Sequence, residues 1–98
     1  MVLPDVIDVR YLGGYRLWLA FRDGVAGEVD LQPHVEFAGV FSPLQDMRYF
    51  AQVRVDPEAG TIVWPNDADL DPVVLYSWVT QRDIPGILAE HSPSKQRR

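Results

Sequence analysis

The strongest constraint on the fold is the stretch over residues 15–31, YRLWLAFRDGVAGEVDL. Apolar and polar side chains alternate from Tyr15 to Phe21, which is typical of a strand with one buried face. The dipeptide Asp23-Gly24 follows and is a frequent turn between antiparallel strands. The stretch therefore predicts a β-hairpin.

Opposing side chains favour one register of this hairpin. A two-residue turn at Asp23-Gly24 would set Leu19 opposite Glu28, bringing a charge into the buried face. A three-residue loop over residues 22–24 avoids this and pairs Phe21 with Val25, Leu19 with Gly27, Leu17 with Val29 and Tyr15 with Leu31. We predict this loop, with Gly24 in the left-handed conformation that closes it with a bulge.

The preceding residues predict a third strand over residues 6–11, with Ile7, Val9 and Tyr11 on one face. A loop of Leu12, Gly13 and Gly14 would pair Tyr11 with Tyr15, Val9 with Leu17 and Ile7 with Leu19. The resulting meander has one buried face and needs a cover.

Residues 31–50 predict two short helices as part of that cover. The first spans residues 33–38 and ends at Gly39. The second has Ser42 as its N-cap and Pro43 at its first position, and it runs to about Arg48.

Residues 51–64 predict a second hairpin, whose four-residue loop, 57–60, pairs Val55 with Ile62 and Val53 with Trp64. Asp71 and Pro72 then predict the start of a helix. Its apolar stripe is Val74, Leu75, Trp78 and Val79. Residues 84–86 (IPG) would break this helix, and residues 87–90 would add one more turn.

The chain has 98 residues, of which 47% are hydrophobic and 23% are charged. This length and composition are typical of one globular domain. We expect an α+β fold, in which an antiparallel sheet of about five strands is covered on one face by short helices. The domain would span residues 2–80, and residues 81–98 would form a C-terminal extension whose last residues are disordered. The chain has no cysteine, no apolar run of about 20 residues and no secretory signal pattern, so we expect a cytoplasmic protein.

The charge is uneven along the chain. The net charge is −5, but residues 95–98 hold three of the nine basic side chains. Residues 1–94 therefore carry six basic and fourteen acidic side chains, a net charge of −8. Phosphate backbones repel such a body, so we expect no nucleic-acid partner. The basic tail SPSKQRR could contact nucleic acid, but we expect it to be a solvated, disordered end.

Three alternating acids, Asp67, Asp69 and Asp71, match the first half of a calcium loop. Pro72 stands where such a loop needs glycine, and Trp78 stands where it needs glutamate. We therefore expect Asp71 to cap a helix and Asp69 to bind backbone groups in the turn. A small enzyme or ligand-binding domain using these acids remains the alternative. We expect no metal or cofactor, because His34 and His91 lack ligand spacing.

Trp18 is the candidate interaction residue. It shares the strand face opposite the apolar stripe with Arg16, Ala20 and Arg22. Tryptophan and arginine are enriched where protein interfaces concentrate their binding energy. Either Trp18 is covered by another part of the chain, or Trp18, Arg16 and Arg22 bind a second copy or another protein.

Three motifs carry a resemblance to a known family: F-x-D-G at residues 21–24, V-D-L at residues 29–31 and W-P-N-x-x-D at residues 64–69. Over residues 4–80 the chain resembles the small bacterial proteins called domain of unknown function 2442. Asp67 stands where that family commonly has glycine, and aspartate tolerates a left-handed backbone better than most residues.

The resemblance implies an α+β domain that occurs alone or joined to a DNA-binding helix-turn-helix. It also implies a neighbouring gene for a second small protein, since such pairs have been proposed as toxin–antitoxin modules. No enzymatic residues are established for the family, so none is carried over. We predict a protein-interaction module, with a transcription-associated regulator as the second alternative.

Overall fold

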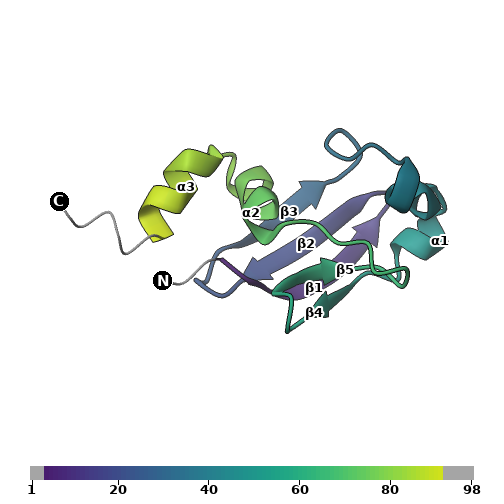
Figure 1. Cartoon of the computed structure of the whole chain (residues 1–98), viewed down its shortest axis with the longest axis horizontal. Coiled ribbons are helices and arrows are strands. Elements are labelled where there is room, and N and C mark those ends of the chain that lie inside the picture. The colour runs from purple at the N-terminus through teal and green to yellow at the C-terminus, as the bar shows by residue number, and fades with distance from the viewer. Residues whose placement is uncertain (1–3, 92–98) are drawn as a thin grey trace.

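The computed structural model describes residues 4–91 and confirms an α+β fold. Its elements are β1 (Val6–Gly13), β2 (Arg16–Phe21), β3 (Ala26–Asp30), the 3-10 helix η1 (Gly39–Gln45), α1 (Met47–Phe50), β4 (Arg54–Asp56), β5 (Thr61–Val63), α2 (Pro72–Thr80) and α3 (Ile84–His91). The five antiparallel strands form two sheets, β1-β2-β3 and β4-β5, rather than one (Figure 1).

The predicted register of the central hairpin is confirmed. Leu17 pairs with Val29 and Leu19 with Gly27. At the two ends, the Phe21 N–H donates to the Val25 carbonyl at 2.8 Å, and the Leu31 N–H donates to the Tyr15 carbonyl at 2.9 Å. Gly24 has a φ of +95°, so the loop needs a residue without a side chain there.

We expect Gly24→Val to lower the free energy of unfolding by more than ~1 kcal/mol, because a β-branched residue resists positive φ. Beyond its own chain neighbours, no heavy atom lies within 4 Å of a Cβ built at Gly24, so a steric clash of the Cβ does not account for the loss. Urea denaturation followed by circular dichroism would measure it. Gly24→Asn, which tolerates positive φ better, should lose less, and an unchanged midpoint in Gly24→Val would refute the strain.

The predicted register of the first hairpin is wrong by two residues. Val9 pairs with Leu19 and Tyr11 pairs with Leu17, and the ladder has irregularities at Val6/Asp8 and Tyr11/Gly13. Gly13 and Gly14 both take positive φ, at +108° and +56°, which allows a tighter turn than the expected three-residue loop.

The irregularity near the start of β1 also changes which side chain enters the core. Val6 is 2% exposed, whereas Ile7 is 52% exposed. An extra residue in one strand reverses the alternation beyond it. The expectation that Ile7 shares the buried face of Val9 and Tyr11 is therefore wrong.

The predicted helix over residues 33–38 is absent from the described structure, which has a turn followed by irregular chain there. Tertiary contacts hold this segment out of a helix. The Gln45 side chain donates from Nε2 to the Phe37 carbonyl at 2.7 Å, and the Tyr15 and Phe37 rings lie 4.7 Å apart. Gly39 begins η1 instead of ending a helix.

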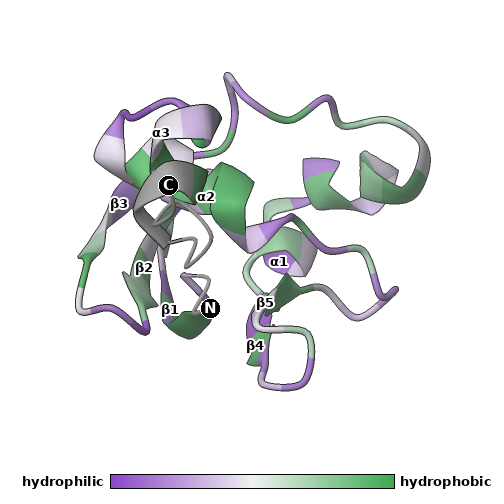
Figure 2. Ribbon diagram, turned by 60° about the vertical axis from the view of Figure 1, so that its left-hand side comes forward, coloured by the Kyte–Doolittle hydropathy of each residue, from purple (hydrophilic) through white to green (hydrophobic). Residues whose placement is uncertain are grey.

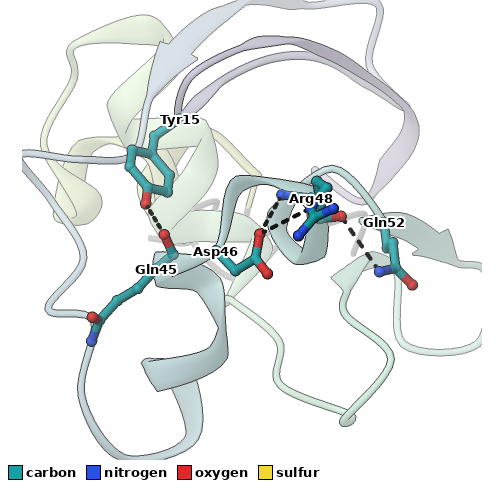
Figure 3. A network of polar contacts seen from close by, with 5 residues as sticks. All are labelled: Tyr15, Gln45, Asp46, Arg48 and Gln52. Atoms are coloured by element: carbon teal, nitrogen blue, oxygen red, sulfur yellow. Dashed lines mark hydrogen bonds and ion pairs between the residues drawn. The ribbon is translucent and has the colours of Figure 1, made fainter.

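The predicted helix from Ser42 to Arg48 is divided in two. Pro43 lies inside η1, which ends at Gln45, and Asp46 then caps α1 by accepting the Arg48 N–H at 2.9 Å. The Tyr15 hydroxyl donates to the Gln45 carbonyl at 2.8 Å and fixes the junction to the sheet (Figure 3). An aspartate capping from position 46 favours a new helix over continuation of the old one.

The second hairpin follows the prediction, with Val55 opposite Ile62 and a loop over residues 57–60. The expected Val53–Trp64 pair is not part of this ladder, because β5 ends at Val63 and the Trp64 N–H donates to the Ala68 carbonyl at 2.9 Å. Chain reversal at Trp64 therefore ends the strand one residue early.

The helix predicted from Asp71 and Pro72 is also confirmed, since Asp71 accepts the Val73 N–H at 2.8 Å. Its buried side chains are Val73, Leu75 and Tyr76, whereas Val74, Trp78 and Val79 are half-buried. Residues 84–86, expected to break this helix, form the first turn of α3. Ile87 of α3 is fully buried, so packed structure continues beyond residue 80.

The core lies on one side of the three-stranded sheet. Figure 2 shows β1, β2 and β3 along one side of the molecule, with α2, α1 and the β4–β5 hairpin on the other. The largest fully buried side chains include Trp64, Phe21, Phe50, Leu17, Leu19 and Leu31. The outward side chains of the sheet are exposed or half-buried, so the described elements leave that face uncovered.

Candidate functional site

The F-x-D-G motif holds the central hairpin to α2. The Phe21 ring meets the Tyr76 ring edge-on with centroids 5.0 Å apart, and the Tyr76 hydroxyl donates to Asp23 Oδ2 at 2.6 Å. Asp23 also accepts the Val25 N–H through Oδ1 at 3.0 Å. The Phe21 and Asp23 side chains of the motif therefore stabilise the fold.

The W-P-N-x-x-D motif closes the turn after β5. The buried Trp64 donates its indole N–H to the Phe50 carbonyl at 2.9 Å, and Asn66 bonds the Ala68 N–H and the Val40 carbonyl. Asp67 has a φ of +68°, as predicted for a residue standing where the family commonly has glycine. This motif too serves the fold.

The three candidate acids occupy different structural positions. Asp67 lies in the turn, Asp69 forms a bridge with Val63, and Asp71 caps α2. Asp69 and Asp71 line an open depression of about 280 Å³ next to Thr61, whose hydroxyl donates to the Leu70 carbonyl. No cluster of three potential metal ligands occurs in the described part of the chain.

We expect no specific calcium binding at these acids, because the glycine and the bidentate glutamate of a calcium loop are absent. Isothermal titration calorimetry with calcium chloride should show no saturable heat up to ~1 mM, the weak end of calcium modules. A tighter isotherm that Asp69→Asn abolishes would overturn this expectation.

His34, the histidine whose side chain the structure describes, makes an aromatic contact. His34 is exposed and its ring stacks on the half-buried Trp78 ring, with centroids 4.4 Å apart and planes 13° apart. This stacking links the loop after β3 to α2. The side chain of His91 lies outside the described residues.

The uncovered side of the three-stranded sheet is the remaining candidate site, and we call it the open face. It comprises Asp8, Arg10, Leu12, Arg16, Trp18, Ala20, Arg22, Ala26, Glu28 and Asp30. Trp18 lies in the middle strand, opposite Arg10 on one side and Glu28 on the other. The face therefore presents a half-buried aromatic side chain within a ring of charges.

Each arginine of the open face has an acidic partner within the face or at its margin. Arg16 donates from Nε to Glu28 Oε2 at 2.7 Å, and Arg10 lies 3.8 Å from Asp8. Arg22 lies 3.8 Å from Asp5. The Arg10 guanidinium also lies 5.2 Å from the Trp18 ring centroid, a cation–π contact that covers part of the indole.

The structure thus places the predicted Trp18, Arg16 and Arg22 on one exposed face, but sequence reasoning missed Arg10 and Glu28. Glu28 lies opposite Trp18 in the register that was predicted correctly for β2 and β3. Arg10 was hidden by the two-residue register error, which set Asp8 opposite Trp18 instead. The paired glycines at 13 and 14 were the signal for the tighter turn.

These features define a small α+β domain with a fold-supporting set of motifs and an uncovered sheet face. The chain belongs to the family described as "Protein of unknown function (DUF2442)", whose model matches residues 6–81. Comparison with curated proteins found no match.

A solved structure from Nitrosomonas europaea ATCC 19718, titled "Putative DNA Binding Protein NE0471", has a similar fold. The TM-score is 0.68 at 24% identity, and the similarity covers 83% of this chain and 54% of that one. The chain therefore spans about half the length of that protein, and the likeness concerns the fold alone. Within residues 4–91, no helix is long and apolar enough to span a membrane.

Proposed function

We propose that this chain is a protein-interaction module that binds another protein chain through its open face. The observation that carries the proposal is Trp18, which lies at the centre of an exposed sheet face and makes no contribution to the core cluster. The motif residues are engaged in the fold, whereas this aromatic side chain is placed where a partner can reach it. Large aromatics with arginine are frequent interface anchors.

The partner is either a second copy or the product of a neighbouring gene. The two-gene, toxin–antitoxin-like pairing implied by the resemblance supports the latter. Both kinds of partner would bury Trp18 against protein, and both predict the same sensitivity to its truncation.

DNA binding is the second candidate function, because the structural relative's title names it. The charges of this chain oppose it: residues 4–91 carry six arginines and fourteen acidic side chains. Such a body repels phosphate, and the likeness to that relative extends over about half of its length. An acid-based enzyme site at Asp67, Asp69 and Asp71 has even less support, since Asp67 lies in the turn at positive φ and the Asp71 carboxylate caps α2.

We expect Trp18→Ala to weaken association by about 30-fold or more if Trp18 is an interface hot spot. The measurement is the affinity for a second copy or for the coexpressed neighbour protein. Met47→Ala is the matched control, because Met47 is 50% exposed and lies in α1, outside the open face. If Trp18→Ala and Met47→Ala bind the partner with equal affinity, the open face is not the binding surface. If Trp18→Ala loses the circular dichroism signal of the folded chain, Trp18 belongs to the core.

A further inference from the structure

The open face differs from the rest of the molecule in its charge. It holds three arginines, Arg10, Arg16 and Arg22, and three acids, Asp8, Glu28 and Asp30. The other described residues hold three arginines and eleven acids. The open face is therefore neutral, and within residues 4–91 the other residues carry the whole of the net charge of −8.

This charge distribution favours a second copy of the chain as the partner that binds the open face. Two copies of an acidic protein repel each other over most orientations, since like charges oppose close approach. Contact through a neutral face keeps the acidic surfaces pointing away from each other. The open face is thus the surface through which two copies can approach with the least repulsion.

The row across the middle of the sheet is also complementary to itself. Arg10, Trp18 and Glu28 are consecutive cross-strand neighbours on β1, β2 and β3, so the opposite charges lie about 10 Å apart on either side of the indole. A two-fold axis running along β2 would place β1 of one copy over β3 of the other. Arg10 of each copy would then face Glu28 of the second copy, twice per dimer.

We infer that the open face binds a second copy of this chain, face to face, about a two-fold axis along β2; the inference rests on the proposed function, because it names the occupant of the same face. The two Trp18 rings meet near the axis, where offset stacking of aromatics is favourable. Glu28 binds Arg16 through Oε2, which leaves Oε1 for the second copy's Arg10.

The open face is small, so we expect a weak dimer. Ten residues form it, whereas a stable interface of standard size has about 20–30 residues on each side. The association is therefore concentration-dependent, with dissociation expected between about 10 μM and 1 mM.

Charge reversal tests the arrangement through sedimentation equilibrium over that concentration range. Arg10→Glu alone sets acid against acid at both contacts, and Glu28→Arg alone sets arginine against arginine. We expect each single variant to self-associate at least ~10-fold more weakly than wild type. An equimolar mixture of the two variants restores both ion pairs, so it should form heterodimers at wild-type strength.

Arg48→Glu is the matched control, since the Arg48 side chain is 94% exposed and lies on α1. It should dimerise like wild type. Circular dichroism confirms folding, and if a reversal unfolds the chain, Arg10→Gln and Glu28→Gln replace the pair and should each weaken self-association.

Three results would overturn the inference. Single reversals that dimerise like wild type would place the dimer contact on another surface. A mixture that fails to associate would refute the Arg10–Glu28 pairing. A wild-type chain that stays monomeric up to 1 mM would exclude the second copy. In that last case, the proposed function still stands if the coexpressed neighbour protein binds the wild-type chain but not Trp18→Ala. The proposed function fails if the neighbour protein binds neither of them.

Discussion

Trp64→Ala is expected to lower the free energy of unfolding by about 3–5 kcal/mol, the usual cost of truncating a buried tryptophan. Trp64 is fully buried, and its ring contacts the Phe50 ring at a centroid distance of 5.6 Å. Truncation would leave a cavity between the turn and α1 and would remove the indole donor from the Phe50 carbonyl. Chemical denaturation with urea would measure the loss.

Trp64→Phe is the informative control, because it keeps an aromatic ring but removes the N–H. Trp64→Phe should lower the free energy of unfolding less than Trp64→Ala does. The difference between the two variants is the part of the loss that comes from the cavity. A small domain has only about 5–15 kcal/mol of stability in total. A loss below ~1.5 kcal/mol in Trp64→Ala would contradict the structural role given to the W-P-N motif.

Gly27→Val is expected to destabilise the chain by about 1–3 kcal/mol through overpacking. Gly27 lies on the core side of β3, opposite Leu19, and α2 packs directly above it. A Cβ built at Gly27 would lie 2.8 Å from Val79 Cγ1, closer than real contacts allow. Because Val79 is β-branched and stiff in a helix, its side chain cannot turn aside.

The double variant Gly27→Val with Val79→Ala tests this contact. Removing the Val79 methyl groups makes room for the new side chain, so the double variant should be more stable than the sum of the single losses predicts, by ~1 kcal/mol or more. Additive losses in a double-mutant cycle would show that the strain at Gly27 has another source.

Local patterns predicted the parts of this fold that local chemistry decides. The Asp23-Gly24 loop, the 57–60 loop and the Asp71-Pro72 helix start each depend on a few adjacent residues, and all three are confirmed. In each case, turn or cap chemistry and the apolar pattern point to the same answer.

Long-range contacts decided the parts that failed. The sequence of residues 33–38 is typical of a short helix, but the contacts of Phe37 with Tyr15 and Gln45 hold the segment in an irregular conformation. Alternation alone could not reveal the irregularity that buries Val6 and exposes Ile7, because one extra residue in a ladder leaves no local signature. The division of the strands into two sheets likewise depends on long-range contacts rather than on local patterns.

The candidate site was predicted in part. Alternation along β2 is sufficient to place Trp18 opposite the core stripe, and the structure agrees. The charge balance of the open face, by contrast, depends on which β1 residues lie beside β2, and the register error concealed it. Only the three-dimensional arrangement shows that Arg10 and Glu28 flank the same indole.

Amide and indole chemical shifts in a ¹⁵N NMR dilution series test the central claim most directly, because they show which surface meets a partner chain. The account predicts that shifts changing with protein concentration cluster on the open face, led by Arg10, Glu28 and the indole of Trp18. The exposed apolar pair of α3, Ile84 and Leu88, is the competing surface. Concentration-dependent shifts confined to α3, with the Trp18 indole unchanged, would contradict the account.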